Sequence, residues 1–400
     1  MLHIIFGVGE KRGVNMKRIP FNKPSISEKE IRYIIDSIKK FHISGDGYYS
    51  KKVQLFLEQT IHTYKALLTT SCSSALDMSA ILLDLKEGDE VILPSYTFVS
   101  TANAVVLRGA TPVFADIQED TLNIDPEDIK RKITSKTKAI FPVHYAGIGC
   151  DMDAIMKIAL EQDLKVVEDA AQGVNAKYRE KYLGTIGHIG CYSFHETKNY
   201  SCGEGGAILI NEDDQSLIER AEVIREKGTN RSKFYRGEVD KYTWVDVGSS
   251  YLPSDILAAF LYAQLEKIDE INEKRKTVYE YYHKNLKEFE QMGLLRLPVI
   301  PEECESNYHM FYLILNSPQE RDYLMYKLKE KGISAVFHYI PLHTSPMGKR
   351  YGYMAGDLPV TENLSYRLLR LPMYPGLTRL EQDYIIEAIN SAMQQLVIAG

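Results

Sequence analysis

The stretch from residue 65 to 211 alternates short apolar runs with amphipathic runs. Seven apolar runs predict strands, at 66–69, 90–93, 111–115, 139–143, 165–167, 190–194 and 206–210. Four amphipathic runs predict helices between them, at 75–83, 100–107, 126–133 and 152–160. This alternation is typical of a mostly parallel sheet covered by helices on both faces. Because ligands on such sheets collect at the carboxyl ends of the strands, the residues that follow each strand are the first candidates for a site.

Lys198 follows the strand expected at 190–194 and precedes a glycine-rich turn, GEGG at 203–206. Glycines permit positive φ and let the backbone approach a bound group closely. A lysine at the end of a buried strand is placed to lose its water shell, and desolvation favours the neutral, nucleophilic amine that a Schiff base requires. The chain has 48 lysines and arginines. An ordinary surface lysine is therefore the simpler explanation until other residues support a catalytic one.

Two segments further upstream support a catalytic lysine. The segment VVEDAAQ at 166–172 places Asp169 at the end of a buried strand, where a carboxylate suits the ring nitrogen of pyridoxal phosphate (PLP). The segment ALLTTSCSSAL at 66–76 reads as a strand, then small hydroxylated residues, then a helix. A helix that begins in this way offers free backbone amides to an anion such as a phosphate. A phosphate cradle, a ring-nitrogen partner and a Schiff-base lysine thus occur in that order.

Longer segments carry a more specific signal, from about residue 19 to the C-terminus. They read IPFNKP, GDEVILPSYTFVSTANAVVLRGA, VVEDAAQG, GTIGHIGCYSFHETKNY, GEGGA, IREKGTNR, VDKYTW, GSSYL and FHYIPLH. With these segments the chain resembles the DegT/DnrJ group of nucleotide-sugar aminotransferases, which are fold-type-I PLP enzymes. The resemblance implies an α/β fold with a mostly parallel seven-stranded sheet flanked by helices, and a small C-terminal α+β domain. It implies a large PLP-binding domain at 19–265, a small domain at 266–400, and an extension at 1–18 that is disordered or precedes the native start.

The resemblance also implies roles for individual residues. Lys198 and Asp169 are the expected catalytic residues, and both contact the cofactor. The other expected cofactor contacts are Cys72, Ser73, Phe98, Gln172, Ser193 and Ser250. Among these, Phe98 is expected to stack on the pyridine ring, and Ser193 to bond the phosphate together with the 72–73 turn. In the FHYIPLH segment, Tyr339 and His343 are the expected substrate contacts.

The segment at 225–251 mixes charged and aromatic residues and reads REKGTNRSKFYRGEVDKYTWVDVGSSY. The residues alone indicate a solvated loop. The resemblance implies that the loop reaches across a homodimer and closes the partner's active site. Ser250 stands where many relatives have an asparagine that contacts the phosphate from the other subunit, and Lys227 stands where many have histidine. Serine can donate the same hydrogen bond, but over a shorter reach.

The expected reaction also follows from the resemblance. It is transfer of the amino group of L-glutamate to C4 of dTDP-4-dehydro-6-deoxyglucose, giving dTDP-4-amino-4,6-dideoxygalactose for surface polysaccharide. The gluco epimer (viosamine) and a 3-amino sugar remain alternative products, because the pose of the sugar over the cofactor decides which product forms. Some members of the group dehydrate a sugar instead, with histidine in place of the lysine, and Lys198 argues against that reaction.

Two other classes of protein fit less well. A PLP-carrying regulator without turnover usually carries a DNA-binding module, and no basic helix-turn-helix candidate is present. A nicotinamide dehydrogenase would rest on Gly7, Gly9 and Gly13 alone. Their spacing departs from GxGxxG, and Pro20 and Pro24 disfavour the helix that should follow.

Composition argues against several classes of binding partner. The formal net charge of −6 gives no broad basic field for nucleic acid or an anionic membrane, and no apolar run approaches the roughly 20 residues that cross a bilayer. The five cysteines form no CxxC pair, and the ten histidines show no metal-ligand spacing. We therefore expect a cytoplasmic protein with reduced thiols and no metal site.

Outside the alternating region, further patterns predict individual elements. Ser27 and Glu30 form a capping-box pattern at the start of a helix, and a second helix is expected at 51–63. A long helix is expected from Pro253 to about Glu290. In the C-terminal part, strands are expected at 310–315 and 335–339, and helices at 319–331 and 380–396.

Overall fold

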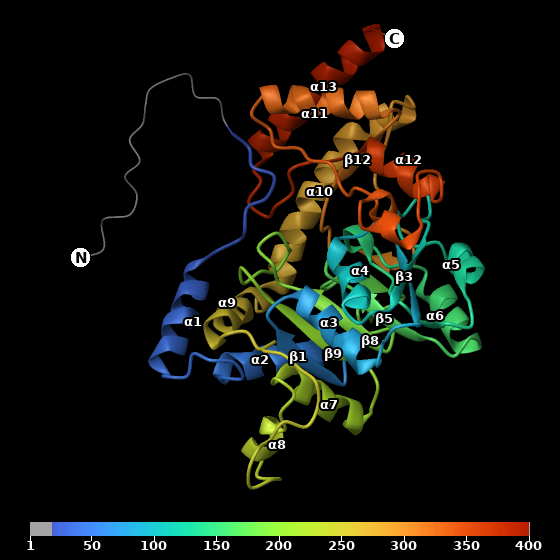
Figure 1. The fold of residues 1–400 in the computed structure, drawn as a ribbon. Helices are drawn as coiled ribbons and strands as arrows, with labels where there is room; N and C mark the ends of the chain where they lie inside the picture. Colours follow the sequence, from blue (N-terminus) through green and yellow to red (C-terminus); the bar gives the residue numbers. More distant parts are fainter. Residues whose placement is uncertain (1–17, 400) are drawn as a thin grey trace.

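The computed structural model describes residues 18–399, so the glycines at 7, 9 and 13 and most of the predicted extension lie outside the described residues. A seven-stranded sheet forms the centre of the molecule (Figure 1). Its strands, in spatial order, are β1 (Lys65–Thr69), β9 (Gly206–Ile210), β8 (Ile189–Ser193), β5 (Lys165–Asp169), β4 (Thr137–Ile140), β2 (Glu90–Pro94) and β3 (Thr111–Ala115). All seven predicted strands are confirmed.

The sheet is mostly parallel, as predicted. Strands β8, β5, β4, β2 and β3 pair in parallel, whereas β9 runs antiparallel to both β1 and β8. Strand β9 is buried along its whole length, and its alternate side chains enter different cores. Ala207 and Leu209 pack on one face of the sheet, and Ile208 and Ile210 pack on the other. The alternation follows from the two-residue period of a strand.

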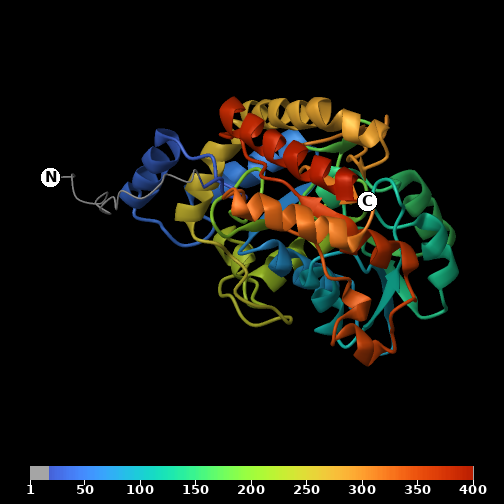
Figure 2. The ribbon, with the colours of Figure 1, turned by 90° about the horizontal axis from the view of Figure 1, so that it is seen from above.

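Helices cover both faces of this sheet (Figures 1 and 2). One face is covered by α2 (Tyr48–Ile61), α5 (Pro126–Lys132), α6 (Met152–Glu161) and α9 (Asp255–Leu265). The other face is covered by α3 (Cys72–Leu82), α4 (Val99–Val106) and α7 (Gln215–Arg225). The four helices predicted between strands are confirmed, although α3 begins three residues earlier than predicted, because Ser71 caps it.

A further core surrounds a smaller sheet of β10 (Leu295–Arg296), β12 (Tyr312–Leu315) and β13 (Leu368–Arg370). The helices α11 (Pro318–Glu330) and α13 (Arg379–Ala399) pack on this core, as does Ile19. The long helix α10 (Ile268–Gln291) joins the two parts, because Ile271 packs in a core of the large sheet and Tyr282 in that of the small one.

The long helix predicted from 253 to 290 is wrong in one respect, because it is two helices. Helix α9 ends at Leu265, and α10 begins at Ile268. Between them Lys267 leaves helical geometry (φ −118°, ψ 21°), and its Nζ donates to Ser27 Oγ at 2.9 Å and pairs with the buried Glu30. Glu30 also completes the predicted capping box of α1 (Glu28–Lys39) with Ser27. A tertiary ion pair therefore accompanies the break.

The strand predicted at 335–339 is also wrong. Only Val336 of this segment pairs with β13, through a single bridge to Arg370, and β12 pairs with β10 and β13 instead. Two residues on, the carbonyl of His338 accepts a hydrogen bond from the Tyr96 hydroxyl. The segment therefore leaves the small sheet and turns toward the large one.

The remaining elements are short or peripheral. They are α8 (Arg231–Tyr235), α12 (Pro359–Arg367), the three-stranded sheet of β11 (Cys304–Glu305), β6 (Lys177–Tyr178) and β7 (Lys181–Tyr182), and 3-10 turns at Tyr145–Gly147, Leu342–Thr344 and Gly348–Tyr351. In the described part of the chain, no helix combines the length and apolarity that a membrane span requires.

Candidate functional site

A cavity of about 440 Å³ opens at the carboxyl ends of the strands of the large sheet. Residues that follow β1, β2, β5 and β8 line one part of it, and residues from the small-sheet side line the rest. The cavity gathers eight of the residues that sequence analysis selected: Cys72, Ser73, Phe98, Asp169, Gln172, Ser193, Lys198 and Tyr339.

Lys198 lies on the loop between β8 and β9, which is closed at its base by backbone hydrogen bonds. Phe194 donates to the carbonyl of Gly205 at 2.8 Å, and Lys198 itself donates through its backbone to His195 at 2.9 Å. Burial lowers the pKa of the Lys198 amine, and the positive charge of Arg370 lowers it further, against the opposing effects of Cys72 and Asp169. The lowered pKa makes the neutral, nucleophilic form of the Lys198 amine easier to reach than in an exposed lysine.

Asp169 ends β5 with a buried carboxylate that lines the cavity. Oδ2 accepts a hydrogen bond from Thr101 Oγ1 at 2.7 Å, and Oδ1 accepts one from the backbone of Ala171 at 3.1 Å. The thiol of Cys72 lies 4.0 Å from Oδ1. These contacts fix the orientation of a carboxylate that can hold a proton on a ring nitrogen.

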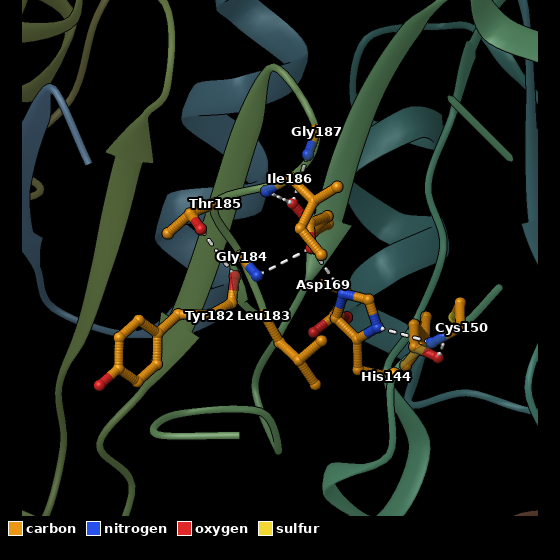
Figure 3. A network of polar contacts seen from close by, with 12 residues as sticks. His144, Cys150, Asp169, Tyr182, Leu183, Gly184, Thr185, Ile186 and Gly187 are labelled. Atoms are coloured by element: carbon orange, nitrogen blue, oxygen red, sulfur yellow. Dashed lines mark hydrogen bonds and ion pairs between the residues drawn. The ribbon is translucent and has the colours of Figure 1, made fainter. Parts of the chain in front are cut away.

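The neighbouring Glu168 anchors the end of β5 through both oxygens of its carboxylate. Its Oε1 accepts from the amides of Ile186 (2.7 Å) and Gly187 (2.5 Å), and its Oε2 accepts from the amide of Gly184 (2.8 Å). His144 Nε2 lies 2.7 Å from the same Oε2, while its Nδ1 accepts from the backbone of Cys150 at 3.1 Å. Figure 3 shows this buried network beside Asp169. It ties the 184–187 turn to β5, the strand that ends in the Asp169 carboxylate.

The N-terminus of α3 forms an anion cradle. Ser71 caps the helix by accepting from the Ser74 amide at 3.1 Å, whereas the first-turn amides of Cys72 and Ser73 have no intrahelical partner. Ser73 Oγ lies 2.7 Å from Ser100 Oγ, and Ser193 also lines the cavity. A Cβ on Gly206 would lie 2.3 Å from the carbonyl carbon of Ser71, so only glycine lets β9 pack against this turn.

Phe98 and Gln172 occupy other parts of the wall. The Phe98 ring is 56% exposed and lies 6.3 Å from the Tyr339 ring, so one face is free to stack on a planar ligand. Gln172 is held by two contacts, because its Oε1 accepts from Ala146 at 2.7 Å and its Nε2 donates to the Tyr339 hydroxyl at 3.3 Å.

Two selected residues lie outside the cavity lining. His343 is completely buried, with Nδ1 at 2.7 Å from Ser95 Oγ and Nε2 at 3.0 Å from Glu362 Oε1. This placement favours a structural role for His343. Ser250 is exposed and pairs through its backbone with Glu226, so within its own chain it does not reach the cavity.

Four basic residues that sequence analysis missed also line the cavity: His195, His309, His338 and Arg370. Burial lowers the pKa values of His309 and His338 well below the usual range, assisted by the charges of Lys198 and Arg370. His338 precedes Tyr339 directly in the FHYIPLH segment, so its place in that segment was a sequence signal from which it could have been selected. His309 and Arg370 gave none, because only the folded arrangement brings them to Lys198.

Comparison with known proteins identifies the group. The model of the DegT/DnrJ/EryC1/StrS aminotransferase family matches residues 24–390. The chain is 33% identical over 376 residues to GDP-perosamine synthase of Escherichia coli O157:H7, covering 94% of this chain and 98% of the relative. It is 32% identical over 389 residues to the spore coat polysaccharide biosynthesis protein SpsC of Bacillus subtilis (strain 168), covering 94% and 97%. The PLP form of Spr1654 from Streptococcus pneumoniae superposes with a TM-score of 0.88 at 26% identity, covering 94% and 99%.

The cavity fits PLP, which is the cofactor of this protein and acts as an electron sink when bound. In this fit the N-terminus of α3 would hold the phosphate, Asp169 would face the ring nitrogen and Lys198 would reach the aldehyde carbon. A sugar aminotransferase with a fold-type-I architecture accounts for the sheet, the cavity and these residues together. By its sequence over nearly its full length, the chain belongs to the DegT/DnrJ/EryC1/StrS aminotransferase family.

Proposed function

We propose that the protein transfers the amino group of L-glutamate to C4 of dTDP-4-dehydro-6-deoxyglucose, giving dTDP-4-amino-4,6-dideoxygalactose for surface polysaccharide. The observation that carries the chemistry is the convergence of Lys198, Asp169 and the α3 cradle on one cavity. The dTDP-linked sugar and the galacto product are supported by the sequence resemblance described above.

Each residue has a defined task in this proposal. The Nζ of Lys198, in its neutral form, would take the proton from the carbon that carries the donor nitrogen and deliver it to the carbon that carries the nitrogen after the transfer. Asp169 holds the proton on the ring nitrogen, with its carboxylate oriented by Thr101 and Ala171. Ser73, Ser193 and the backbone at Cys72 hold the phosphate, while Phe98 and Gln172 limit the movement of the ring.

The proposal includes a cytoplasmic homodimer with shared active sites. The 225–251 loop supports the dimer, because it exposes several large apolar side chains. A loop that contacted only solvent would not need such a group of apolar side chains, whereas an interface would bury them. They are Phe234, Tyr235, Tyr242, Trp244, Val245 and Val247. In a dimer this loop would carry Ser250 to the phosphate end of the partner's cavity. The five cysteines are free, which suits a reducing compartment.

A second candidate is a GDP-linked keto sugar with the same chemistry. It is favoured by the identity to GDP-perosamine synthase along nearly the whole chain. The gluco epimer and a 3-amino sugar are further variants of the same reaction.

The test is incubation of the PLP-loaded protein with L-glutamate and either dTDP-4-dehydro-6-deoxyglucose or the corresponding GDP-linked keto sugar. NMR of the product then assigns the position and orientation of the amine. We expect an axial amine at C4 of the dTDP sugar. An equatorial C4 amine, a C3 amine, or a preference for the GDP sugar would overturn the named product. Failure to aminate any keto sugar would overturn the function as a whole.

A further inference from the structure

The ring of His309 is locked in one tautomer by the residue that follows Lys198. Nδ1 of His309 lies 2.9 Å from Oδ1 of Asn199, whose Nδ2 donates to the carbonyl of Asn307 at 2.7 Å. A carbonyl only accepts, so the Asn199 amide must turn its Nδ2 to Asn307 and its Oδ1 to His309. That Oδ1 also only accepts, and the proton of the imidazole therefore sits on Nδ1.

The other ring nitrogen, Nε2, is a free acceptor. Burial lowers the pKa of His309 well below the usual range, and the charges of Lys198 and Arg275 lower it further, so the ring is neutral. A neutral imidazole with its proton on Nδ1 carries a lone pair on Nε2. Within residues 18–399, only Nδ1 of this ring forms a hydrogen bond. His309 lines the cavity, so Nε2 is available to a donor there.

The backbone that carries His309 is held in an unusual conformation. Tyr308 has a φ of 53°, in the left-handed region that a bulky residue seldom adopts. Arg275 holds this backbone, because its Nε donates to the carbonyl of Tyr308 at 3.0 Å and its Nη2 to that of His309 at 2.5 Å. Asn307 ties the same segment to the loop after β5. Strain that is held in this way concentrates at functional sites.

The amine of Lys198 is a donor that lacks an acceptor. Cys72 and Asp169 support its positive charge through electrostatics alone, without a hydrogen bond. Lys198 and His309 line the cavity together, and both also line a smaller gap beside it. The charge of Lys198 acts on the imidazole, which places the two groups within electrostatic reach of each other.

We propose that Nε2 of His309 accepts a hydrogen bond from the Lys198 amine and so directs the lone pair of that amine, which makes His309 a positioning residue for the proton transfer. The proposal rests on the proposed function, in which Lys198 moves the proton. A free amine at the end of a flexible four-carbon stem rotates, and one fixed acceptor restricts its direction. The same acceptor binds the amine more strongly while it holds the proton, because hydrogen bonds to charged groups are stronger.

Two substitutions separate this role from a purely structural one. The side-chain amide of asparagine lies where Nδ1 of histidine lies, and that of glutamine lies where Nε2 lies. His309→Asn therefore keeps a donor to Asn199 but removes the acceptor that faces Lys198. His309→Gln keeps an acceptor at the place of Nε2 but loses the donor to Asn199. If His309 served only to hold Asn199, the protein would tolerate His309→Asn better than His309→Gln.

The control is His62→Asn. His62 lies outside the cavity lining and ends α2 with a φ of 62°, a conformation that asparagine tolerates. This substitution makes the same chemical change at a site where no effect on Lys198 is expected.

The first measurement uses the cofactor-free protein. Stopped-flow absorbance gives the rate of PLP entry as a function of pH, and its midpoint reports the pKa of Lys198. Loss of an acceptor that stabilises the charged amine should move the midpoint of His309→Asn down by about half a pH unit or more. His309→Gln and His62→Asn should stay close to wild type. The other charged and titratable groups that act on the two side chains are the same in every variant: Cys72, Asp169, Arg275, His338 and Arg370.

The second measurement is the donor half-reaction with L-glutamate and with glutamate deuterated at Cα. A misdirected amine slows the proton step, so His309→Asn should react at least about tenfold more slowly and show a larger isotope effect than wild type. His309→Gln should retain most of the rate.

Several results would overturn the proposal. One is an unchanged midpoint in a folded His309→Asn, and another is a His309→Gln that shifts as far as His309→Asn. A normal half-reaction with weakened binding of the keto sugar would also do so, because Nε2 would then serve the sugar. If His309→Asn does not fold, 15N NMR of the wild-type histidines decides, since a proton on Nε2 of His309 would contradict the proposal. The expected midpoints in a protein that aminates no keto sugar would refute the proposed function alone.

Discussion

The hydroxyl of Thr101 donates a 2.7 Å hydrogen bond to Oδ2 of Asp169. Thr101 lies in the first turn of α4 and Asp169 ends β5, so the bond joins the helix after one strand to the tip of another. Phe98 immediately precedes the same helix. One short element therefore orients the carboxylate of Asp169 and places the aromatic ring that is proposed to stack on the cofactor.

Replacing Asp169 by asparagine should leave cofactor binding largely intact and reduce kcat by about 10²-fold or more, because the amide cannot hold the proton on the ring nitrogen. Thr101→Val removes the orienting bond, together with the contacts of this hydroxyl with Thr97 and Phe98, and should cost about fivefold to tenfold. Absorbance of the bound cofactor and steady-state kinetics measure both effects. Near-normal kcat in Asp169→Asn would remove its assigned role.

Lys198→Ala should lose more than about 10³-fold in activity and should also lose the covalent bond to the cofactor. Mass spectrometry after borohydride reduction detects that bond directly. The exposed Lys138 provides the control, since Lys138→Ala should keep both the bond and the activity. A reduced adduct found on any lysine other than Lys198 would contradict the site.

The lowered pKa of Lys198 predicts how cofactor loading depends on pH. Only the neutral amine attacks the aldehyde, so the rate at which PLP enters the cofactor-free protein should rise with pH and reach half of its maximum below the usual lysine pKa of 10.5. Because the charge of Arg370 helps to lower this pKa, Arg370→Met should shift the profile to higher pH. Stopped-flow absorbance provides the profile. A half-maximal rate at or above pH 10.5 in wild type would be inconsistent with a depressed pKa.

Glu168→Gln should destabilise the protein by about 3 kcal/mol, since the new amide would face the Gly184 amide and His144 with donors on both sides. Urea unfolding of the cofactor-free protein measures the effect. Glu305→Gln is the control, because Glu305 is 65% exposed in its ion pair with Lys177 and its loss should cost less than about 1 kcal/mol. Equal costs for the two variants would show that the buried network adds no stability.

Trp244 reports on the proposed dimer, since it is the single tryptophan of the sequence and is 77% exposed in one chain. If a partner covers the 225–251 loop, its fluorescence should shift to shorter wavelength as protein concentration rises, and acrylamide should quench it less. Analytical ultracentrifugation of the same samples gives the mass. Emission typical of exposed tryptophan in a sample that sediments as a dimer would exclude this loop from the interface.

The sequence predicted those parts of the molecule that depend on neighbours along the chain. The large sheet followed from local periodicity, and Asp169, Ser73 and Lys198 were found because each follows a strand. Features that depend on distant contacts were missed or misplaced. Arg370 reaches Lys198 only through the packing of the small sheet, and the ion pair of Lys267 with Glu30 accompanies a helix break that periodicity does not reveal.

The reversed strand β9 has a consequence for how this protein can diversify. Ser193 and Gly206 face each other in the β8–β9 pairing, so both ends of the loop that carries Lys198 are held by paired strands of the large sheet. Arg370, by contrast, ends β13 of the small sheet, which has a core of its own. Chimaeras that exchange the small sheet between relatives should therefore change the part of the cavity lining that Arg370 forms and leave the loop that carries Lys198 in place.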